Sequence, residues 1–302
     1  MKFLIAGGTG LIGSNTIDLI LKHGHQINVL SRKSRKSNNP NLKYFTWDPS
    51  RNLIDESCIN NVDTIINLTG SSVFTLWLPH IKNRILNSRI NSLSILYSLL
   101  KKNKNHNIKQ LISASAIGIY PNNNNTVYYE DVQFESHTFL ASVVKEWEFK
   151  ANEFKNLNIN VSIIRIGLVL SEKGGFLEKL ISINKFKIST LIDSGSQWQS
   201  WIHINDLSSI IYYLSLNKIE GTFNAVSPNP VKFKELQNFV NNRFNKPLIK
   251  FNVPKILFII AFSILRIKDF YYDIIASNKN VSSKKIQDYG YKFIFNKLKN
   301  IK

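Results

Sequence analysis

Cysteine, acidic residues and long apolar runs are scarce in this chain of 302 residues. Its single cysteine, Cys58, excludes a disulfide framework and is consistent with a reducing compartment. The N-terminal run "MKFLIA" is too short for a signal peptide. We therefore expect a cytoplasmic protein.

One stretch, "ILFIIAFSIL" at residues 256–265, is strongly apolar, but it has only about half the length that a bilayer span needs. Two interpretations are open: a helix buried in a C-terminal lobe, or a helix that lies on a membrane surface. We favour the buried helix, and we accordingly expect no membrane partner.

Acidic residues are outnumbered, because 39 Lys and Arg stand against 20 Asp and Glu, giving a formal net charge of +19. An excess of this size raises nucleic-acid binding as a hypothesis that rests on charge alone. The lysines are dispersed among asparagines and isoleucines, and the sequence has neither a basic module interleaved with aromatics nor the spacing of a zinc site. We therefore expect no nucleic-acid partner and no metal.

Seven residues near the N-terminus, "GGTGLIG" (7–13), carry glycines in the G-x-x-G-x-x-G register between a strand pattern and a helical pattern. In that context Gly7 makes a tight turn, Gly10 lets a pyrophosphate approach the backbone, and Gly13 packs the helix against the strand. The N–H groups at the start of the helix favour an anion. The loop predicts a dinucleotide site formed by Gly7, Thr9, Gly10, Leu11, Ile12 and Gly13.

The next strand pattern, residues 27–30, lacks at its end the acidic residue that would bind the free 2′-hydroxyl of NAD. Ser31, Arg32 and Lys33 stand there instead. A guanidinium suits a 2′-phosphate, so the sequence favours NADP(H) over NAD(H), with Ser31 and Arg32 at the cofactor. The alternative is a solvated basic turn.

Strand patterns recur along the chain, and helical patterns lie between most of them; further strands are expected at residues 42–47, 62–68, 109–114 and 159–166. A long helical face covers residues 78–102. This alternation predicts an α/β fold with a doubly wound, Rossmann-like parallel sheet.

Short helical patterns dominate from residue 228, with a strand-like link at 246–254. We expect residues 1–226 to form the dinucleotide-binding domain, with 175–205 contributing to the substrate side. Residues 227–302 are expected to form a small, mainly helical C-terminal lobe.

Five stretches, in their order along the chain, resemble the extended, epimerase-like branch of the short-chain dehydrogenase/reductase superfamily. They are "GGTGLIG" (7–13), "ISASAIGIYP" (112–121) with the following 129–148, "RIGLVLSEKGG" (165–175), "SGSQWQSWIHINDL" (194–207) and a segment beginning "IIASN" (274–278). More closely, the chain resembles the atypical NAD-dependent epimerase family proteins with a small C-terminal domain. The resemblance covers nearly the whole chain and implies an NAD(P)-binding oxidoreductase or epimerase.

The resemblance also implies roles for single residues. Asp48, in "TWDP", is implied to lie near the adenine, and Leu68, Thr69 and Gly70 along the nicotinamide ribose. Ser115 matches the superfamily's active-site serine, which holds the reacting carbonyl or hydroxyl by hydrogen bonding.

Ordinary members have a tyrosine and a lysine one helical turn apart after that serine, and this chain lacks both. On a shared helix face the ammonium lowers the pKa of the phenol, which then transfers a proton. Leu140 and Val144 align with these positions, and neither moves a proton. Candidate replacements are Tyr120, His203 and a water molecule.

A second departure concerns charge beside a tryptophan. Relatives usually carry basic residues just before it, whereas "SSVFTLWL" (71–78) has no positive charge before Trp77. An anionic substrate group held there would lose its partner.

Two functions are compatible with these features. The first is an NADP(H)-dependent oxidoreductase or epimerase-like enzyme, whose small polar substrate lies between Ser115, Tyr120 and residues 196–203. The second is an NADP(H)-binding sensor or scaffold without turnover, which the missing tyrosine and lysine support. The sequence leaves the substrate and the oligomeric state open.

Overall fold

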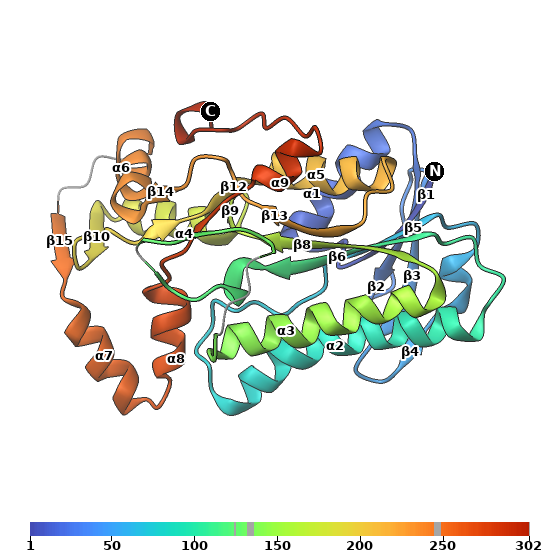
Figure 1. The fold of residues 1–302 in the computed structure, drawn as a ribbon, viewed down its shortest axis with the longest axis horizontal. Helices are drawn as coiled ribbons and strands as arrows, with labels where there is room; N and C mark the ends of the chain where they lie inside the picture. Colours follow the sequence, from blue (N-terminus) through green and yellow to red (C-terminus); the bar gives the residue numbers. More distant parts are fainter. Residues whose placement is uncertain (124, 132–135, 245–248, 302) are drawn as a thin grey trace.

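A computed structural model describes residues 1–123, 125–131, 136–244 and 249–301. Its centre is an eight-stranded sheet in the order β13-β8-β6-β5-β1-β2-β3-β4 (Figure 1). Neighbouring strands are parallel, except that β4 runs antiparallel to β3. The strands of this sheet are β1 Lys2–Ala6, β2 Gln26–Ser31, β3 Leu42–Asp48, β4 Leu53–Ile54, β5 Thr64–Asn67, β6 Gln110–Ala116, β8 Asn160–Ile166 and β13 Gly221–Ala225.

Helices cover both faces of this sheet. The α-helices of the described chain, those of the second lobe included, are α1 Leu11–Lys22, α2 Pro79–Lys102, α3 Phe139–Asn152, α4 Gly175–Lys185, α5 Ile204–Leu216, α6 Phe233–Arg243, α7 Lys255–Ile264, α8 Lys268–Phe270 and α9 Lys284–Asp288. Helices α1 and α5 pack on one face, and α2 and α3 on the other (Figure 1). Central strands are therefore buried on both sides, and β1 is apolar throughout its buried length, from Phe3 to Ala6. The predicted doubly wound α/β fold is confirmed.

A second lobe lies beyond the carboxyl end of the sheet (Figure 1). Helices α4 and α6 pack around a small core, and the short strands pair locally: β10 with β15, β11 with β14, β12 with β9, and β16 with β7. Their bounds are β7 Val127–Tyr128, β9 Leu168–Leu170, β10 Ile188–Ile192, β11 Trp198–Gln199, β12 Trp201–His203, β14 Val231–Lys232, β15 Ile249–Val253 and β16 Asn280–Val281.

The link expected at 246–254 contains β15, although residues 246–248 lie outside the described part of the chain. The last segment returns to the main body, where Ile286 and Tyr291 join the core beside α5. The division of the chain at residue 226 stays a prediction.

The helix expected at 256–265 exists as α7, but the expectation that it is buried is wrong. None of its residues is buried, and Ile264 is 76% exposed. An apolar sequence indicates that a helix is able to bury a face. Whether another element covers that face depends on the tertiary arrangement. Among the described residues, no helix is long and apolar enough to cross a membrane.

Candidate functional site

A cavity of about 520 Å³ opens at the carboxyl ends of β1, β2 and β5. The chain order reverses between β1 and β5, which is where ligands of open parallel sheets bind. Nine of the predicted cofactor residues line it: Gly7, Thr9, Gly10, Ser31, Arg32, Asp48, Leu68, Thr69 and Gly70. The other three, Leu11, Ile12 and Gly13, form the first turn of α1 and do not line it.

The glycine loop is packed so closely that a side chain at Gly7 or Gly13 would clash with backbone atoms. Gly7 has φ of +83°, and a Cβ there would lie 2.7 Å from the carbonyl carbon of Leu68. A Cβ on Gly13 would lie 2.3 Å from the oxygen of Gly7. At Gly10 the nearest atom would be 3.4 Å away, so the space beside it is open.

This open space adjoins the start of α1, whose N-cap Gly10 offers no side chain to the N–H groups of the first turn. The first turn also holds no acidic residue. Unpaired N–H groups at a helix start, beside a glycine that leaves room, suit a phosphate or pyrophosphate. The residues present therefore fit the phosphates of a dinucleotide.

The end of β2 forms the next wall of the cavity. The Ser31 hydroxyl donates to the Lys33 carbonyl at 2.7 Å and accepts from the Lys33 N–H at 3.2 Å, which fixes the turn that carries Arg32. Arg32 is exposed on the cavity wall, and within the described ranges its guanidinium has no hydrogen-bond or ion-pair partner. Its charge is therefore available to an anion.

Asp48, on the same wall, is occupied by its own turn. Its carboxylate accepts from the Ser50 hydroxyl at 2.6 Å and the Ser50 N–H at 3.0 Å, and it pairs with Arg51 at 3.6 Å. The hydrogen bond from the Ser50 hydroxyl is the main reason why the pKa of Asp48 is lowered. Within the described residues, Asp48 forms no ion pair with Arg32.

Sequence reasoning missed the wall that α2 contributes. Polar side chains recur there with helical spacing, beside the apolar face, and they are Arg84, Asn87, Ser88, Asn91 and Ser92. That polar stripe was the available signal. Behind it, Arg89 donates to the carbonyls of Ile85 and Ser71 at 2.8 and 3.3 Å, and Ser88 accepts from the Ser71 N–H at 2.9 Å. Burial lowers the pKa of Arg89 to about 10.

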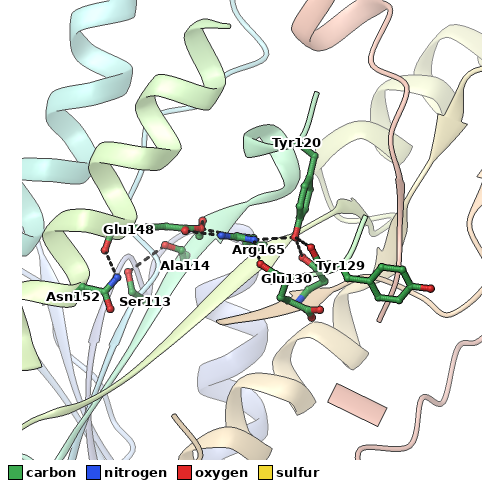
Figure 2. A network of polar contacts seen from close by, with 10 residues as sticks. Ser113, Ala114, Tyr120, Tyr129, Glu130, Glu148, Asn152 and Arg165 are labelled. Carbon is green, nitrogen blue, oxygen red and sulfur yellow. Dashed lines mark hydrogen bonds and ion pairs between the residues drawn. The ribbon is translucent and has the colours of Figure 1, made fainter. Parts of the chain in front are cut away.

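Ser115 lies at the carboxyl end of β6, outside the residues that line the cavity, and its hydroxyl is already bonded. It donates to Oε1 of Glu148 at 2.6 Å, and the side chain is 2% exposed. Glu148 in turn forms a two-bond ion pair with Arg165 of β8, with both distances at 2.9 Å (Figure 2). Arg165 and Glu148 were not predicted.

The signals for this pair were present in the sequence. Glu148 follows Val144 by four residues, and therefore lies on the same face of α3 as the two positions where the family pair is missing. Arg165 is a charged residue inside an apolar strand, and such a residue requires a buried partner.

Tyr120 belongs to the same network (Figure 2). Its hydroxyl accepts from Nη1 of Arg165 at 2.9 Å and donates to Oδ1 of Asn224 at 2.7 Å, and the side chain is 1% exposed. Burial raises the pKa of Tyr120 to about 12, although the charge of Arg165 opposes this shift. Tyr120 does not line the cavity.

His203 stands at the start of α5, where its Nδ1 accepts from the N–H of Asn205 at 3.3 Å. Its ring packs on Phe295 with the centroids 3.7 Å apart, and burial lowers its pKa. These contacts give His203 a structural role as a helix cap, and it does not line the cavity.

Leu140 and Val144, which align with the missing pair, are both buried in α3. The backbone N–H of Leu140 donates to Asp273 of the second lobe at 3.0 Å. Val144 packs in an apolar cluster with Tyr120 and Val281. Neither side chain offers a proton.

Known proteins resemble this chain in sequence over nearly its whole length. The sequence model of the NAD dependent epimerase/dehydratase family matches residues 3–225. Epimerase family protein SAR0825 of Staphylococcus aureus is 33% identical over 299 residues, which are 99% of this chain and 96% of that protein.

Solved structures resemble the fold. Human epimerase family protein SDR39U1, solved with NADPH, superposes with a TM-score of 0.80 at 23% identity, over 99% of this chain and 97% of that one. The dTDP-glucose 4,6-dehydratase of Bacillus anthracis, solved with NAD, gives a TM-score of 0.74 at 15% identity, over 98% and 93% of the two chains.

Proposed function

The chain belongs to the NAD-dependent epimerase/dehydratase family, and on that basis we propose that it is an NADP(H)-dependent oxidoreductase or epimerase-like enzyme acting on a small polar substrate. The observation that carries the choice of NADP(H) is Arg32, whose guanidinium lies on the wall of the cavity at the end of β2 and has no partner among the described residues. Asp48, the acidic group on that wall, is held by Ser50 and Arg51. The solved relative that contains NADPH supports the same choice.

Each part of the cavity has a task in this proposal. The N–H groups at the start of α1 would hold the pyrophosphate, Arg32 would hold the 2′-phosphate, and residues 68–70 would contact the nicotinamide ribose. The bound cofactor supplies or accepts a hydride. Ser115 holds the substrate oxygen after exchanging its bond to Glu148, and the proton comes from a group other than Leu140 or Val144.

Titration of the purified protein with NADPH and NADH tests the cofactor. We expect tighter binding of NADPH, and we expect Arg32→Ala to remove about 1.5–3 kcal/mol of that preference, the value of a charge-assisted contact. Arg35→Ala is the matched control, since Arg35 is exposed in the same loop but does not line the cavity. Equal affinities for the two cofactors in the unaltered protein would refute NADP(H) preference.

A second function is an NADP(H)-binding sensor or scaffold without turnover. It is favoured by the part of the proposed site around Ser115 and Tyr120, which we call the reaction end. Leu140 and Val144 cannot transfer a proton, and the hydroxyls of Ser115 and Tyr120 are bonded to protein groups. NADPH oxidation with a broad panel of carbonyl compounds separates the two functions. Turnover supports the enzyme, whereas a folded, NADPH-saturated sample without turnover supports the sensor or scaffold.

A further inference from the structure

Helix α7 carries an apolar surface that no other described part of the chain covers. Ile256, Leu257, Ile260 and Ile264 are 54%, 56%, 51% and 76% exposed, and Ala261 is also exposed. These positions recur as i, i+1, i+4, i+5 and i+8, so they form one stripe along the helix. We call this stripe the α7 outer face.

The opposite side of α7 already has its packing partners. Phe258 stacks on Tyr271 with centroids 6.0 Å apart, and Phe262 packs on Phe270 at 5.6 Å. The Ser263 hydroxyl donates to the carbonyl of Ile259, so this polar group is satisfied by the helix itself. The lobe therefore packs without using the α7 outer face.

The apolar surface continues from α7 onto the preceding strand. Ile249 and Phe251 of β15 are 56% and 47% exposed. In Figure 1, β15 and α7 lie at the outer end of the molecule, away from the eight-stranded sheet. No residue of either element lines the cavity. The α7 outer face, Ile249 and Phe251 thus form an apolar ridge that is separate from the candidate site.

Positive charge surrounds this ridge. Residues 249–268 contain four Lys or Arg and no Asp or Glu, and the exposed cations include Lys255, Arg266 and Lys268. The carboxylates near these cations are few. Asp269 is paired with Lys82 at 2.6 Å, and Asp193 follows β10, where its N–H donates to Val253.

We propose that the α7 outer face, together with Ile249 and Phe251, binds the surface of a bilayer that contains anionic lipids. Apolar side chains of such a helix enter the boundary between headgroups and acyl chains, while flanking cations meet lipid phosphates. The helix of 10 residues is about 15 Å long, half the thickness of a bilayer core, so it lies along the surface.

The charges favour this partner over a second copy of the chain. A two-fold contact would bring the ridge against itself and place Lys255, Arg266 and Lys268 of one copy near those of the other. Anionic lipid headgroups neutralise these cations, and a flat, deformable surface accepts a convex ridge. For this face, the proposal departs from the expectation of no membrane partner.

Sedimentation of the full chain with vesicles tests the proposal. We expect binding to vesicles of phosphatidylcholine with 30% phosphatidylglycerol on the order of tenfold stronger than to phosphatidylcholine alone, and weaker binding at high salt. The double substitution Leu257→Glu/Ile260→Glu should reduce binding at least tenfold. The double substitution Lys255→Gln/Lys268→Gln, which keeps the apolar stripe, should remove most of the preference for the anionic lipid.

Phe149→Glu is the matched control, because Phe149 is 67% exposed on α3 and should not affect binding. Circular dichroism and thermal unfolding establish that the variants are folded. No binding of the unaltered chain to anionic vesicles would overturn the proposal, as would undiminished binding of the Leu257→Glu/Ile260→Glu variant. Sedimentation equilibrium that shows a dimer broken by this double substitution would assign the face to a second copy.

The single cysteine permits a direct measurement that does not depend on a charge change. Cys58 is buried, and burial raises the pKa of its thiol to about 12, so it reacts poorly with labels. A polarity-sensitive fluorophore on Ile264→Cys should shift to the blue on addition of anionic vesicles, whereas the same label on Phe149→Cys should not. An unshifted label at position 264 would contradict insertion of the α7 outer face.

Discussion

The cofactor end and the reaction end of the proposed site differ in whether their polar groups are already hydrogen-bonded to other groups of the protein. At the cofactor end, Arg32 has no partner within the described ranges, and the N-cap Gly10 leaves the first turn of α1 without a side-chain acceptor. At the reaction end, Ser115 donates to Glu148, and Tyr120 lies between Arg165 and Asn224.

This difference has separate consequences for cofactor binding and for the chemical step. A free donor beside a cavity can accept a ligand at once, whereas a buried donor must first leave its partner and so leave that partner unsatisfied. The cofactor end is therefore ready to bind. If the protein is an enzyme, we expect the reaction end to transfer a proton only after its network rearranges, or by way of a water molecule.

The largest change that we expect is at the cofactor end, on Gly10→Val. The space beside Gly10 is open in the protein, so the fold tolerates the side chain, but the side chain occupies the position of the pyrophosphate. NADPH affinity should fall more than a thousandfold, or by more than about 4 kcal/mol, in calorimetric titration with an unchanged unfolding midpoint. Unchanged affinity in the folded variant would contradict the cofactor site.

Gly13→Ala is the contrasting substitution in the same loop. Its Cβ would lie 2.3 Å from the oxygen of Gly7, so the loop itself must move. We expect this smaller side chain to lower the thermal stability, which Gly10→Val leaves intact. If both substitutions lower the unfolding midpoint equally, the loop excludes side chains at both positions. Gly10 is then required by the fold and not by the ligand alone.

The next largest change concerns the reaction end, on Arg165→Met. Arg165 holds Glu148 through two bonds and also donates to the Tyr120 hydroxyl. Because removal of one partner leaves a mostly buried carboxylate without a counter-ion, the free energy of unfolding should fall by about 3 kcal/mol in urea titration. The double substitution Arg165→Met/Glu148→Leu should recover part of this loss, and no recovery would show that the two residues act independently.

A third change concerns the buried positive charge of Lys279 in the second lobe. This lysine is 3% exposed, its Nζ lies 3.4 Å from the Ser277 hydroxyl, and burial lowers its pKa to about 8 despite nearby Asp273. The unfolded chain, with a lysine pKa near 10.4, binds more protons above pH 8, so stability rises with pH between about 8 and 10.5. Below pH 8 the cost of the buried charge is fully present.

Lys279→Met removes the cost of the buried positive charge, although the protein also loses the attraction between Lys279 and Asp273. We expect it to raise the free energy of unfolding at pH 7 by roughly 2–3 kcal/mol, and the difference from the unaltered protein to shrink toward pH 10.5. Urea titrations of both proteins at pH 7, 8, 9 and 10 measure this difference. A constant difference across the series would show that Lys279 does not titrate in this range.

Sequence reasoning succeeded where local pattern decides the structure. The strands around β1 and the glycine loop were predictable, because apolar runs and the spacing of Gly7, Gly10 and Gly13 are local signals. The burial of α7 was predicted wrongly, because the apolar side chains of a helix do not reveal whether another element covers them. Glu148 and Arg165 were missed because they come from α3 and β8 and meet only when the sheet forms.

Ser115→Ala should have the smallest effect on stability and decides what the reaction end does. Glu148 keeps both bonds to Arg165 when the Ser115 hydroxyl is lost, so the free energy of unfolding should fall by only about 1 kcal/mol. NADPH affinity should be unchanged, because Ser115 does not line the cavity. If the protein is an enzyme, turnover should nevertheless fall roughly tenfold to a thousandfold, as for other preorganised hydrogen-bond donors.

Ser113→Ala is the matched control, since Ser113 is also buried on β6 but donates only to the carbonyl of Ala114, at 3.2 Å. It should leave turnover unchanged. Turnover that survives Ser115→Ala intact would keep the enzyme and remove Ser115 from its site, and Tyr120→Phe and His203→Gln in the same assay would then be compared. Loss of turnover in Ser115→Ala alone, at constant NADPH affinity, would show that the hydroxyl exchanges Glu148 for the substrate, because a purely structural hydroxyl would affect stability and not the chemical step.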